Sequence, residues 1–555
     1  MLLQSCTAHD LKFAAILEDI HMDDMQEMWE SLTSSTPAAR RDDKNDPREP
    51  PPPATPLEFP RCEPSKLPVT ESGVSNDLVK LFSSTLRTGP TAKHLQALNV
   101  SLANELSLEQ VVPTDFIPHS SWSKYPAASE PSESSQAALS RSKSLSNGAP
   151  IPGKDEFFVR VRELLHSNED AFRAIQRKPP LPNRQPARIV HFRKFWEGLL
   201  LVAEHWDTSL DKYSDSKHTE SKSAMDVDEL RSEATEAGPK METDKGGELK
   251  KTYTGHRTGT GRDMPGKYRE DTAFAFVETL TWAFRCRLEQ PHSQQRLNLQ
   301  GTIIPILHAA SVHRVPEDVR EARRGVAEGP MLGVFCREQT SFRGLDEVEG
   351  EGKQEILDLL RETGLMLMLA QKRAREGKEE EVPGKGKWWA NAPRWGGGAG
   401  GELGVADEET TGDPTSFEFS RKRLKKSSRM DAWMSLQPPS SIWERGVRYQ
   451  QLGKDKNSEY DDIYLASAIN HHISILHLRI HQKYIDYLLK TPDQSKVSNA
   501  PQQTWYALEM KRSKWFDLLM ADDRVEAMRG IWAILGWQMR DMTEDTDKDD
   551  VGGTA

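Results

Sequence analysis

Residues 268–288 read Tyr-Arg-Glu-Asp-Thr-Ala-Phe-Ala-Phe-Val-Glu-Thr-Leu-Thr-Trp-Ala-Phe-Arg-Cys-Arg-Leu. Apolar side chains recur in this stretch at spacings of three and four, namely Ala273, Phe276, Val277, Leu280, Phe284 and Leu288. That spacing is typical of a helix that buries one face. Phe274 and Trp282 lie off this stripe, so we expect the helix to contact neighbours on more than one side. The stretch therefore predicts the core helix of a central domain.

The segments that follow this helix predict a small α+β core over residues 253–375. Residues 297–307 alternate between apolar and polar side chains and then become β-branched, which is typical of a strand. Residues 330–337 indicate a second short strand, and residues 353–374 a long helix with an apolar stripe. Pro316, which two acids follow, is typical of the first turn of a short helix between the strands. Such an alternation of helices and strands favours an α+β arrangement.

Further helices are predicted on both sides of this core. Residues 154–165 and 189–210 have aromatic and aliphatic faces, and we expect them to complete the central domain. Residues 463–489 have a near-heptad stripe that predicts the main helix of a C-terminal helical domain, formed by Ile469, Ile473, Leu476, Ile480 and Tyr484. Residues 505–520 and 523–539 would complete a helical hairpin. The expected fold class is therefore mainly α with a small α+β central core.

The composition indicates several folded parts joined by long disordered linkers. Of the 555 residues, 36% are apolar and 29% are charged, and the mean hydropathy is −0.69. That is too polar for one compact body of this length. The expected organisation is a largely disordered N-terminal region (1–153), the helical part of the central domain (154–210), a disordered acidic insertion (211–252), the central core (253–375), a disordered linker with a basic cluster (376–440), the C-terminal helical domain (441–540) and an acidic tail (541–555).

Cysteine use, charge and hydropathy indicate a soluble intracellular protein. The four cysteines are far apart with no CxxC spacing, which argues against a disulfide scaffold or a zinc ribbon and favours a reducing compartment. Because the formal net charge is −11, any nucleic-acid contact requires a local basic surface. The first ten residues do not resemble a secretory signal, and the longest apolar runs (199–203 and 365–370) are too short to span a bilayer.

The most specific functional signal is a basic cluster in the second linker. Five of the six residues 421–426 are basic, namely Arg421, Lys422, Arg423, Lys425 and Lys426. A compact exposed cluster of this kind is what the acidic groove of a nuclear import receptor binds as an extended peptide. The same charges could instead contact phosphates, or form a solvated charge run. We interpret the cluster as a nuclear localisation signal, with an import receptor as its partner.

A glycine- and arginine-rich loop precedes the core helix. Residues 261–267 match GxxxxGK, but Tyr268 stands where a phosphate-binding loop needs Ser or Thr, and Pro265 removes an N–H from the cradle. We therefore expect no nucleotide cofactor. Basic residues at a helix N-terminus can nevertheless hold phosphate groups. The candidate contact surface for RNA or DNA comprises His256, Arg257, Arg262, Lys267 and Arg269. The alternative is an ordinary basic loop that forms salt bridges with Glu270 and Asp271.

Neither a catalytic site nor a metal site is predicted. His471, His472, His477 and His481 crowd one predicted helix, and the last two could share a face, but no third ligand stands at helical spacing. Cys286 lies between two arginines, which would favour a thiolate in an exposed position, although a buried thiol fits the pattern better. No GxSxG motif is present. We therefore expect no catalytic residue, no metal ligand and no cofactor.

The stretch over residues 253–286, which begins Tyr-Thr-Gly-His-Arg-Thr-Gly-Thr-Gly-Arg-Asp-Met-Pro, resembles an uncharacterised protein family of filamentous ascomycete fungi. The resemblance covers about residues 155–375 and implies no activity. A further association is with hypoxia-responsive morphology factors of such fungi, which would imply a nuclear regulator.

These observations predict a non-enzymatic nuclear regulatory or scaffold protein that acts through partner binding in the control of gene expression. One alternative is an RNA- or DNA-binding regulator that uses the basic Gly/Arg loop. Another is a cytoplasmic enzyme of unknown type, which would need a deep polar pocket with convergent His, Asp or Arg side chains in the central domain. The expected partners are the import receptor, unidentified proteins and RNA or DNA, without a membrane.

Overall fold

The computed structural model contains two compact units. Unit 1 comprises Met1–Pro51 and Ser209–His256, and unit 2 comprises Pro52–Thr208 and Arg257–Ala555. Within these ranges the structure describes residues 51–64, 78, 81–82, 91–123, 144–215, 251–253, 255–290, 295–300, 302–306, 309–318, 320–321, 326–344, 346–374, 448–455, 457–489 and 504–542. The described part of unit 1 contains an antiparallel pair of short strands, β2 (Tyr213–Asp215) and β3 (Lys251–Tyr253).

Unit 2 is built on a nine-stranded mixed sheet with the strand order β1-β12-β11-β10-β8-β7-β4, in which β13 also pairs with β11 and β9 with β8. Its strands are β1 (Val100–Leu106), β4 (Cys286–Glu289), β7 (Ala309–Arg314), β8 (Val326–Arg337), β9 (Arg448–Gln450), β10 (Tyr460–Ile469), β11 (His472–His481), β12 (Leu508–Ser513) and β13 (Phe516–Asp517). The pairs β1–β12, β8–β10 and β8–β9 are parallel, and the others are antiparallel. A separate hairpin consists of β5 (Arg296–Leu299) and β6 (Thr302–Pro305).

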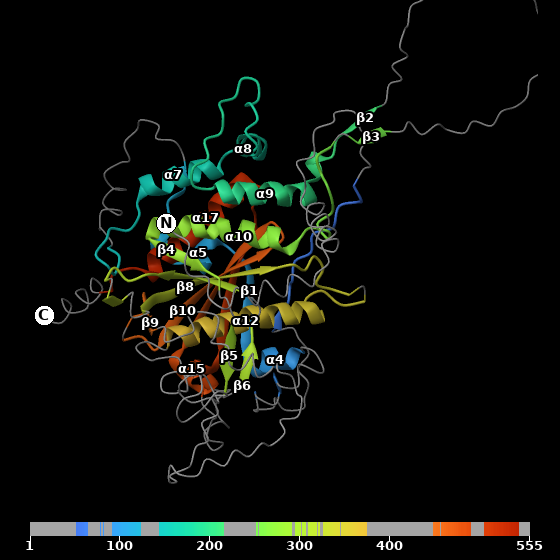
Figure 1. The fold of residues 1–555 in the computed structure, drawn as a ribbon. Coiled ribbons are helices and arrows are strands. Elements are labelled where there is room, and N and C mark those ends of the chain that lie inside the picture. Colours follow the sequence, from blue (N-terminus) through green and yellow to red (C-terminus); the bar gives the residue numbers. More distant parts are fainter. Residues whose placement is uncertain are drawn as a thin grey trace, which may run out of the picture. The chain divides into compact units, whose positions relative to one another are not determined.

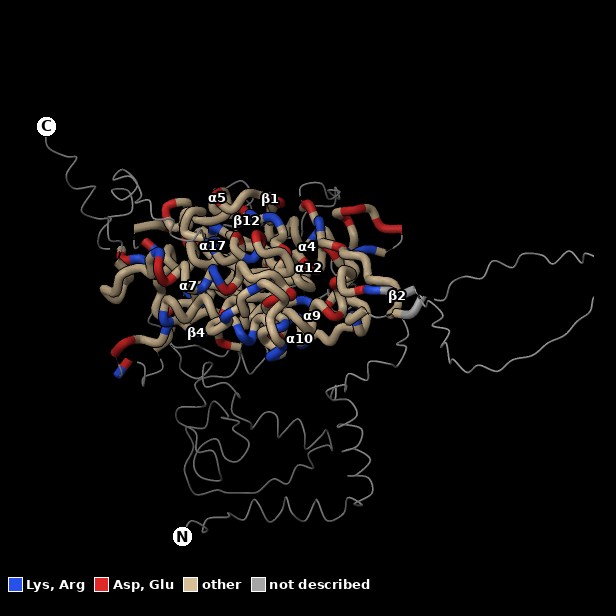
Figure 2. The backbone as a smooth tube through the Cα atoms, turned by 90° about the horizontal axis from the view of Figure 1, so that it is seen from above, with Lys and Arg blue, Asp and Glu red and all other residues tan. Residues whose placement is uncertain are grey.

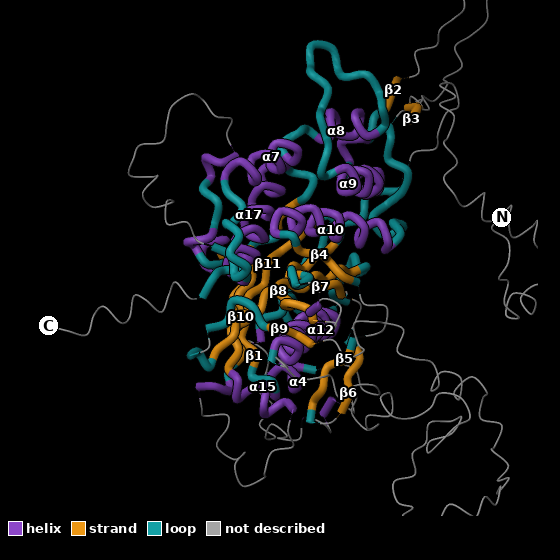
Figure 3. The backbone as a smooth tube through the Cα atoms, turned by 60° about the vertical axis from the view of Figure 1, so that its left-hand side comes forward, coloured by secondary structure: helices purple, strands orange, loops and turns teal. Residues whose placement is uncertain are grey.

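Helices cover both faces of this sheet (Figures 1 and 3). One side carries α5 (Leu108–Val111), α7 (Lys154–Leu164), α8 (Asn168–Ile175), α9 (Arg193–Trp206), α10 (Gly266–Thr281) and α17 (Ala521–Gln538). The other side carries α4 (Ala92–Ala97), α12 (Lys353–Arg373) and α15 (Gln482–Leu489). None of the described helices combines the length and the apolar composition that a bilayer span requires.

The prediction of a mainly α fold with a small α+β core is wrong, because the described part of unit 2 forms an α/β fold around a large sheet. Residues 463–489, predicted as one long helix, belong to the strands β10 and β11 and to the short helix α15. Helices cover both faces over the last part of β10 and the first part of β11, so apolar side chains lie on both faces there. A strand buried on both faces loses the polar alternation that would distinguish it from a helix. Residues 505–520, also predicted as helical, contain β12 and β13.

Other predicted elements are confirmed with changed bounds. The predicted core helix is α10, but it ends at Thr281 and a short 3-10 turn follows. Arg285 then adopts a left-handed conformation (φ 55°), and the chain continues as β4. The long helix α12 and the strand β8 lie where the sequence predicts them, whereas residues 297–307 contribute to a hairpin and not to a single strand.

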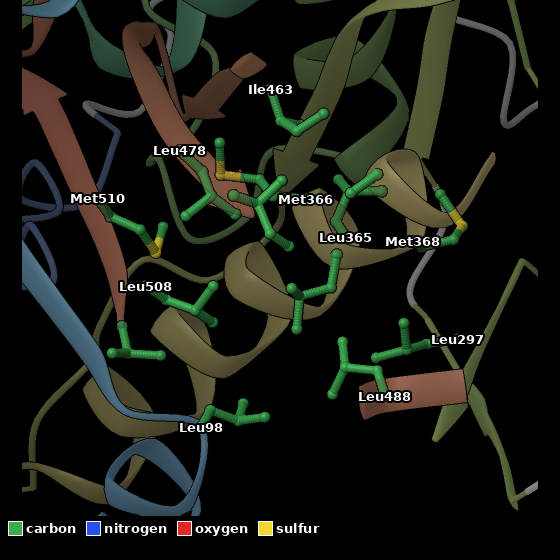
Figure 4. Packing of buried hydrophobic residues seen from close by; sticks show 14 of the residues in the cluster. Leu98, Leu297, Leu365, Met366, Met368, Ile463, Leu478, Leu488, Leu508 and Met510 are labelled. Carbon is green, nitrogen blue, oxygen red and sulfur yellow. The ribbon is translucent and has the colours of Figure 1, made fainter. Parts of the chain in front are cut away.

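The main hydrophobic core lies between α12 and the sheet (Figure 4). The segment Leu365–Ala370 of α12 is buried all round, because the sheet lies on one side of it and α4, α15 and the β5–β6 hairpin on others. The side chains that meet it include Leu98, Leu297, Ile463, Leu478, Leu488, Leu508 and Met510. From Leu98 to Met510 these residues span more than 400 positions of the chain, so distant segments of unit 2 share one core.

A network of buried charges lies on the same side of the sheet. Arg337 of β8 forms an ion pair with Asp358 of α12 (Nη2 to Oδ2, 2.8 Å) and a second one with Glu362. Glu362 also forms an ion pair with Arg512 of β12 and accepts a hydrogen bond from Ser467 of β10. Burial alone would raise the pKa of Glu362, but the two guanidinium groups lower it below its ordinary value. The network therefore ties α12 to three strands.

Candidate functional site

The predicted basic loop turns two of its cations inward. Arg257 is buried and donates to the carbonyls of Pro52 (3.0 Å) and Gly259 (3.3 Å). Arg269, which is 2% exposed, donates to the carbonyls of Met264 (2.9 Å) and Gly261 (2.7 Å) and to the side chain of Asn470. Both guanidinium groups therefore hold the loop together and are not available to a ligand.

The remaining predicted residues of that loop are divided between the two units. Arg262 and Lys267 are exposed in unit 2, whereas His256 is exposed and belongs to unit 1. A Cβ added to Gly266 would lie 2.0 Å from the carboxylate of Glu338, so an acid occupies the would-be phosphate cradle. The GxxxxGK match thus reflects close packing and not a nucleotide site.

Two other sequence signals have separate outcomes. The basic cluster Arg421, Lys422, Arg423, Lys425 and Lys426 lies outside the described residues. Cys286 is buried, and burial raises the pKa of its thiol to about 12, so it is not a thiolate at neutral pH.

A different polar surface emerges where four strands lie side by side. On β11, His477 and Arg479 point to the side of the sheet opposite α12, and they pair with Lys511 and Glu509 of β12. Glu509 pairs in turn with Ser101 of the edge strand β1. The strand β12 alternates between buried and exposed residues from Leu508 to Lys511, so its charged side chains face solvent. We name this surface the open face, formed by Ser101, Asp462, His477, Arg479, Glu509 and Lys511.

The open face begins where the helical cover of the sheet ends. Gly530 of α17 lies against Ile475 of β11 and Leu108 of α5 so closely that an added Cβ would come within 2.3 Å of Ile475. One step further along the strand, His477 is partly exposed and Arg479 is exposed. The C-terminal end of α17 borders this surface, because the side chain of Gln538 donates to the Asp462 carbonyl (2.8 Å).

Asp462 and His477 form an ordered pair on the open face. His477 Nε2 lies 2.9 Å from Asp462 Oδ1, and its ring stacks on that of Tyr464 with a centroid distance of 4.8 Å. Burial alone would raise the pKa of Asp462, but the hydrogen bond from His477 and the charges of Arg479 and Arg540 lower it below its ordinary value. The carboxylate is therefore ionised at neutral pH and fixes the orientation of the imidazole.

Arg479 and Lys511 are the accessible cations of this surface. The guanidinium of Arg479 lies over the ring of Tyr460 at 4.8 Å. In the described part of the chain, no carboxylate lies within ion-pair distance of Arg479 or Lys511, and no cation lies within ion-pair distance of Glu509. Exposed cations that form no ion pair remain accessible to an anionic ligand.

The sequence pattern on β12 indicates this surface, but the prediction of residues 505–520 as a helix missed it. The run from Leu508 to Lys511 alternates apolar and charged residues, which is the pattern of a half-exposed strand. His477 and His481, considered as a helical metal pair, lie on one strand about 13 Å apart at 3.3 Å per residue. Each has its own carboxylate, Asp462 for His477 and Glu459 for His481.

The open face combines an oriented imidazole, two cations and two carboxylates on neighbouring strands. Such a set can bind anionic groups and can move a proton at a bound ester. A deep polar pocket is not part of it; the cavity of about 170 Å³ found on the described surface lies elsewhere, beside Arg314 and Glu328. No protein-family model matches this chain, and neither does a curated protein or a solved structure.

Proposed function

We propose that this protein is a regulator that binds single-stranded RNA through the open face. The observation that carries the proposal is the pair of accessible cations, Arg479 and Lys511, on an uncovered sheet. Lysine and arginine side chains that form no ion pair within the protein can contact phosphate groups. The basic cluster at residues 421–426 supports a role in the nucleus, in the control of gene expression.

The form of the surface favours a single strand over a duplex. An uncovered sheet offers a flat platform on which unstacked bases can lie, and aromatic rings beside it can stack on them. Tyr460 lies under Arg479, while Phe116 and Trp537 contact each other near the end of α17, with ring centroids 5.5 Å apart. Basic and acidic positions are interspersed over the described part of unit 2 (Figure 2), so no long basic stripe is present to follow a duplex.

The test measures fluorescence polarisation of labelled single-stranded RNA at two salt concentrations. We expect the double variant R479E/K511E to weaken binding at least about tenfold and to reduce the salt dependence, because two phosphate contacts become repulsive. The matched control is R162E/K194E, with the same charge change on α7 and α9; both of its residues are exposed.

A third variant separates this surface from the predicted loop. R262E/K267E reverses the exposed cations of that loop and should bind like the wild type. If R479E/K511E binds RNA as tightly as the control, the open face is not the binding surface. If R262E/K267E alone loses binding, the loop is the contact and the present proposal is wrong.

A second candidate function is cleavage of the bound RNA, which the Asp462–His477 pair favours. An imidazole held by a carboxylate can remove the proton of a 2′-hydroxyl, whose oxygen then attacks the neighbouring phosphorus. That step forms a 2′,3′-cyclic phosphate and breaks the bond between phosphorus and the 5′-oxygen, which takes a proton from the imidazolium or from water and leaves as a 5′-hydroxyl end. Cleavage of end-labelled RNA but not DNA, abolished by H477A and retained by H481A, would support it. Intact RNA after prolonged incubation with wild-type protein would exclude it.

A further inference from the structure

The turn between β10 and β11 brings two histidines against one carboxylate. Ile469 pairs with His472, so only Asn470 and His471 form the turn, and Asn470 adopts a left-handed conformation (φ 51°). On the neighbouring strand β13, Asp517 pairs directly with His472. His471 Nε2 lies 3.7 Å from Asp517 Oδ1, and His472 Nε2 lies 3.9 Å from Asp517 Oδ2.

Both imidazoles are buried with unused nitrogens. His471 is 4% exposed and His472 is 7% exposed. The Nδ1 atom of each has no hydrogen-bond partner among the described residues, and the distances from Nε2 to Asp517 exceed those of a hydrogen bond. A buried polar atom without a partner is costly, so each of these rings has a nitrogen that a further ligand could satisfy.

We propose that His471, His472 and Asp517 bind a zinc ion. One ring nitrogen of each histidine and one carboxylate oxygen all lie within 4.8 Å of one another. Ligand atoms about 2.0–2.2 Å from a shared ion must lie within about 4 Å of each other, so a small inward movement of the side chains completes the set. Two imidazoles and one carboxylate suit Zn²⁺, with water as the fourth ligand.

The surroundings fit a site of this kind. The Leu519 N–H donates to Asp517 Oδ1 at 2.8 Å, and the Leu518 N–H donates to the His471 carbonyl at 2.8 Å, so the backbone holds the ligands in place.

Aromatic rings enclose the site while Asp517 leaves an entrance. The ring of Trp206 lies 5.4 Å from that of His471, and the ring of Phe59 lies 4.9 Å from that of His472. The Asp517 side chain is 26% exposed, so an ion and a water can reach it from solvent. The ion would fasten the hairpin turn to the segment that leads into α17.

The test uses the full chain, freed of metal by a chelator and dialysed against Zn²⁺. We expect about one tightly bound zinc ion per chain by elemental analysis, and a visible absorption band when Co²⁺ replaces zinc. D517N keeps the shape of the side chain and should weaken zinc binding at least about tenfold, while H471N/H472Q should lose the site. Zn²⁺ should raise the Tm of the wild type but not that of H471N/H472Q.

The control is H477Q/H481Q, which removes two histidines of β11 that have their own carboxylates and should retain zinc. If H471N/H472Q does not fold, D517N decides the matter through the Co²⁺ spectrum. Wild-type protein that holds no zinc after dialysis, or D517N that binds Zn²⁺ and Co²⁺ as the wild type does, would overturn the proposal.

Discussion

Arg512 and Lys511 are neighbours on β12, yet they lie on opposite faces of the sheet and have opposite roles. Arg512 points toward α12, is 4% exposed and forms an ion pair with Glu362. Lys511 points to the open face and has no ion pair among the described residues. Alternate residues of a strand point to opposite faces of the sheet. The face to which a charged residue of β12 points therefore decides whether it is buried in an ion pair or available to a ligand.

The buried side tolerates its charges because each guanidinium group lies against a carboxylate. Arg337 and Arg512 oppose Asp358 and Glu362, so the network has no net charge, and Ser467 adds hydrogen bonds to it. Removing one member of a buried set leaves an uncompensated charge, which costs more than the set itself contributes. Removing Glu509 or Lys511 from the open face leaves no buried charge without a partner, because water solvates these exposed side chains.

The largest expected effect therefore comes from a pair of identical substitutions, one on each side. Glu362→Gln removes a charge that two guanidinium groups surround, and we expect it to lower the free energy of unfolding by about 3–5 kcal/mol. Glu509→Gln on the open face should change it by less than about 0.5 kcal/mol. Urea unfolding at neutral pH measures both.

This comparison fails if the two substitutions have similar effects. A loss below about 1 kcal/mol for Glu362→Gln would mean that water enters the network and that its burial is not maintained in solution. Equal denaturant slopes for the two variants are the control, since they show that the folded and unfolded states keep their compactness.

The same alternation explains which parts of the fold the sequence could predict. Helices such as α12 were predictable because their apolar residues recur at helical spacing over several turns. The strands β10 and β11 were not, because Ile469, Ile473 and Ile480 lie at spacings that a helix also allows, and most positions on either face of these strands are buried. The residue Asn470 before His471 was the available sign of a tight turn.

The candidate site could not be predicted from the sequence, because it depends on which distant strands pair. The open face joins Ser101 of β1 to Glu509 of β12, a pairing that spans most of the chain. No local pattern states which distant strands pair, so the residues could be identified singly but not assembled. The basic loop, in contrast, was visible in the sequence, but the burial of Arg257 and Arg269 depends on the tertiary packing around them.

The Asp462–His477 pair should have an intermediate effect that depends on pH. The pKa of Asp462 in the folded protein lies below its ordinary value of 3.8. The ionised carboxylate therefore stabilises the fold above that pH, and this contribution is lost as the pH falls through the folded-state pKa. We expect Asp462→Asn to cost about 1–2 kcal/mol near neutral pH. The difference from the wild type should shrink at about pH 3.5.

Urea unfolding at both pH values measures this difference, and Asp455→Asn serves as the control. Among the described residues, the Asp455 carboxylate accepts one hydrogen bond, from the N–H of Asn457 at 2.8 Å, so its substitution should have little effect at either pH. A difference for Asp462→Asn that stays constant between the two pH values would show that the carboxylate is not stabilised by His477.

The smallest expected effect is a gain in affinity for RNA. Glu509 lies between Arg479 and the edge strand and is the acid that a phosphate on the open face would meet. Glu509→Gln should therefore tighten RNA binding about two- to fivefold at low salt, the scale of one exposed charge interaction, and the gain should fade as salt rises. Polarisation titrations measure it against Glu321→Gln, an exposed acid on another part of unit 2.

Unchanged affinity for Glu509→Gln, together with a loss for R479E/K511E, would place the RNA strand on the His477 side of the face and away from β1. A loss of affinity for Glu509→Gln would instead mean that this carboxylate accepts hydrogen bonds from the bases, so that it contributes to recognition and not to repulsion.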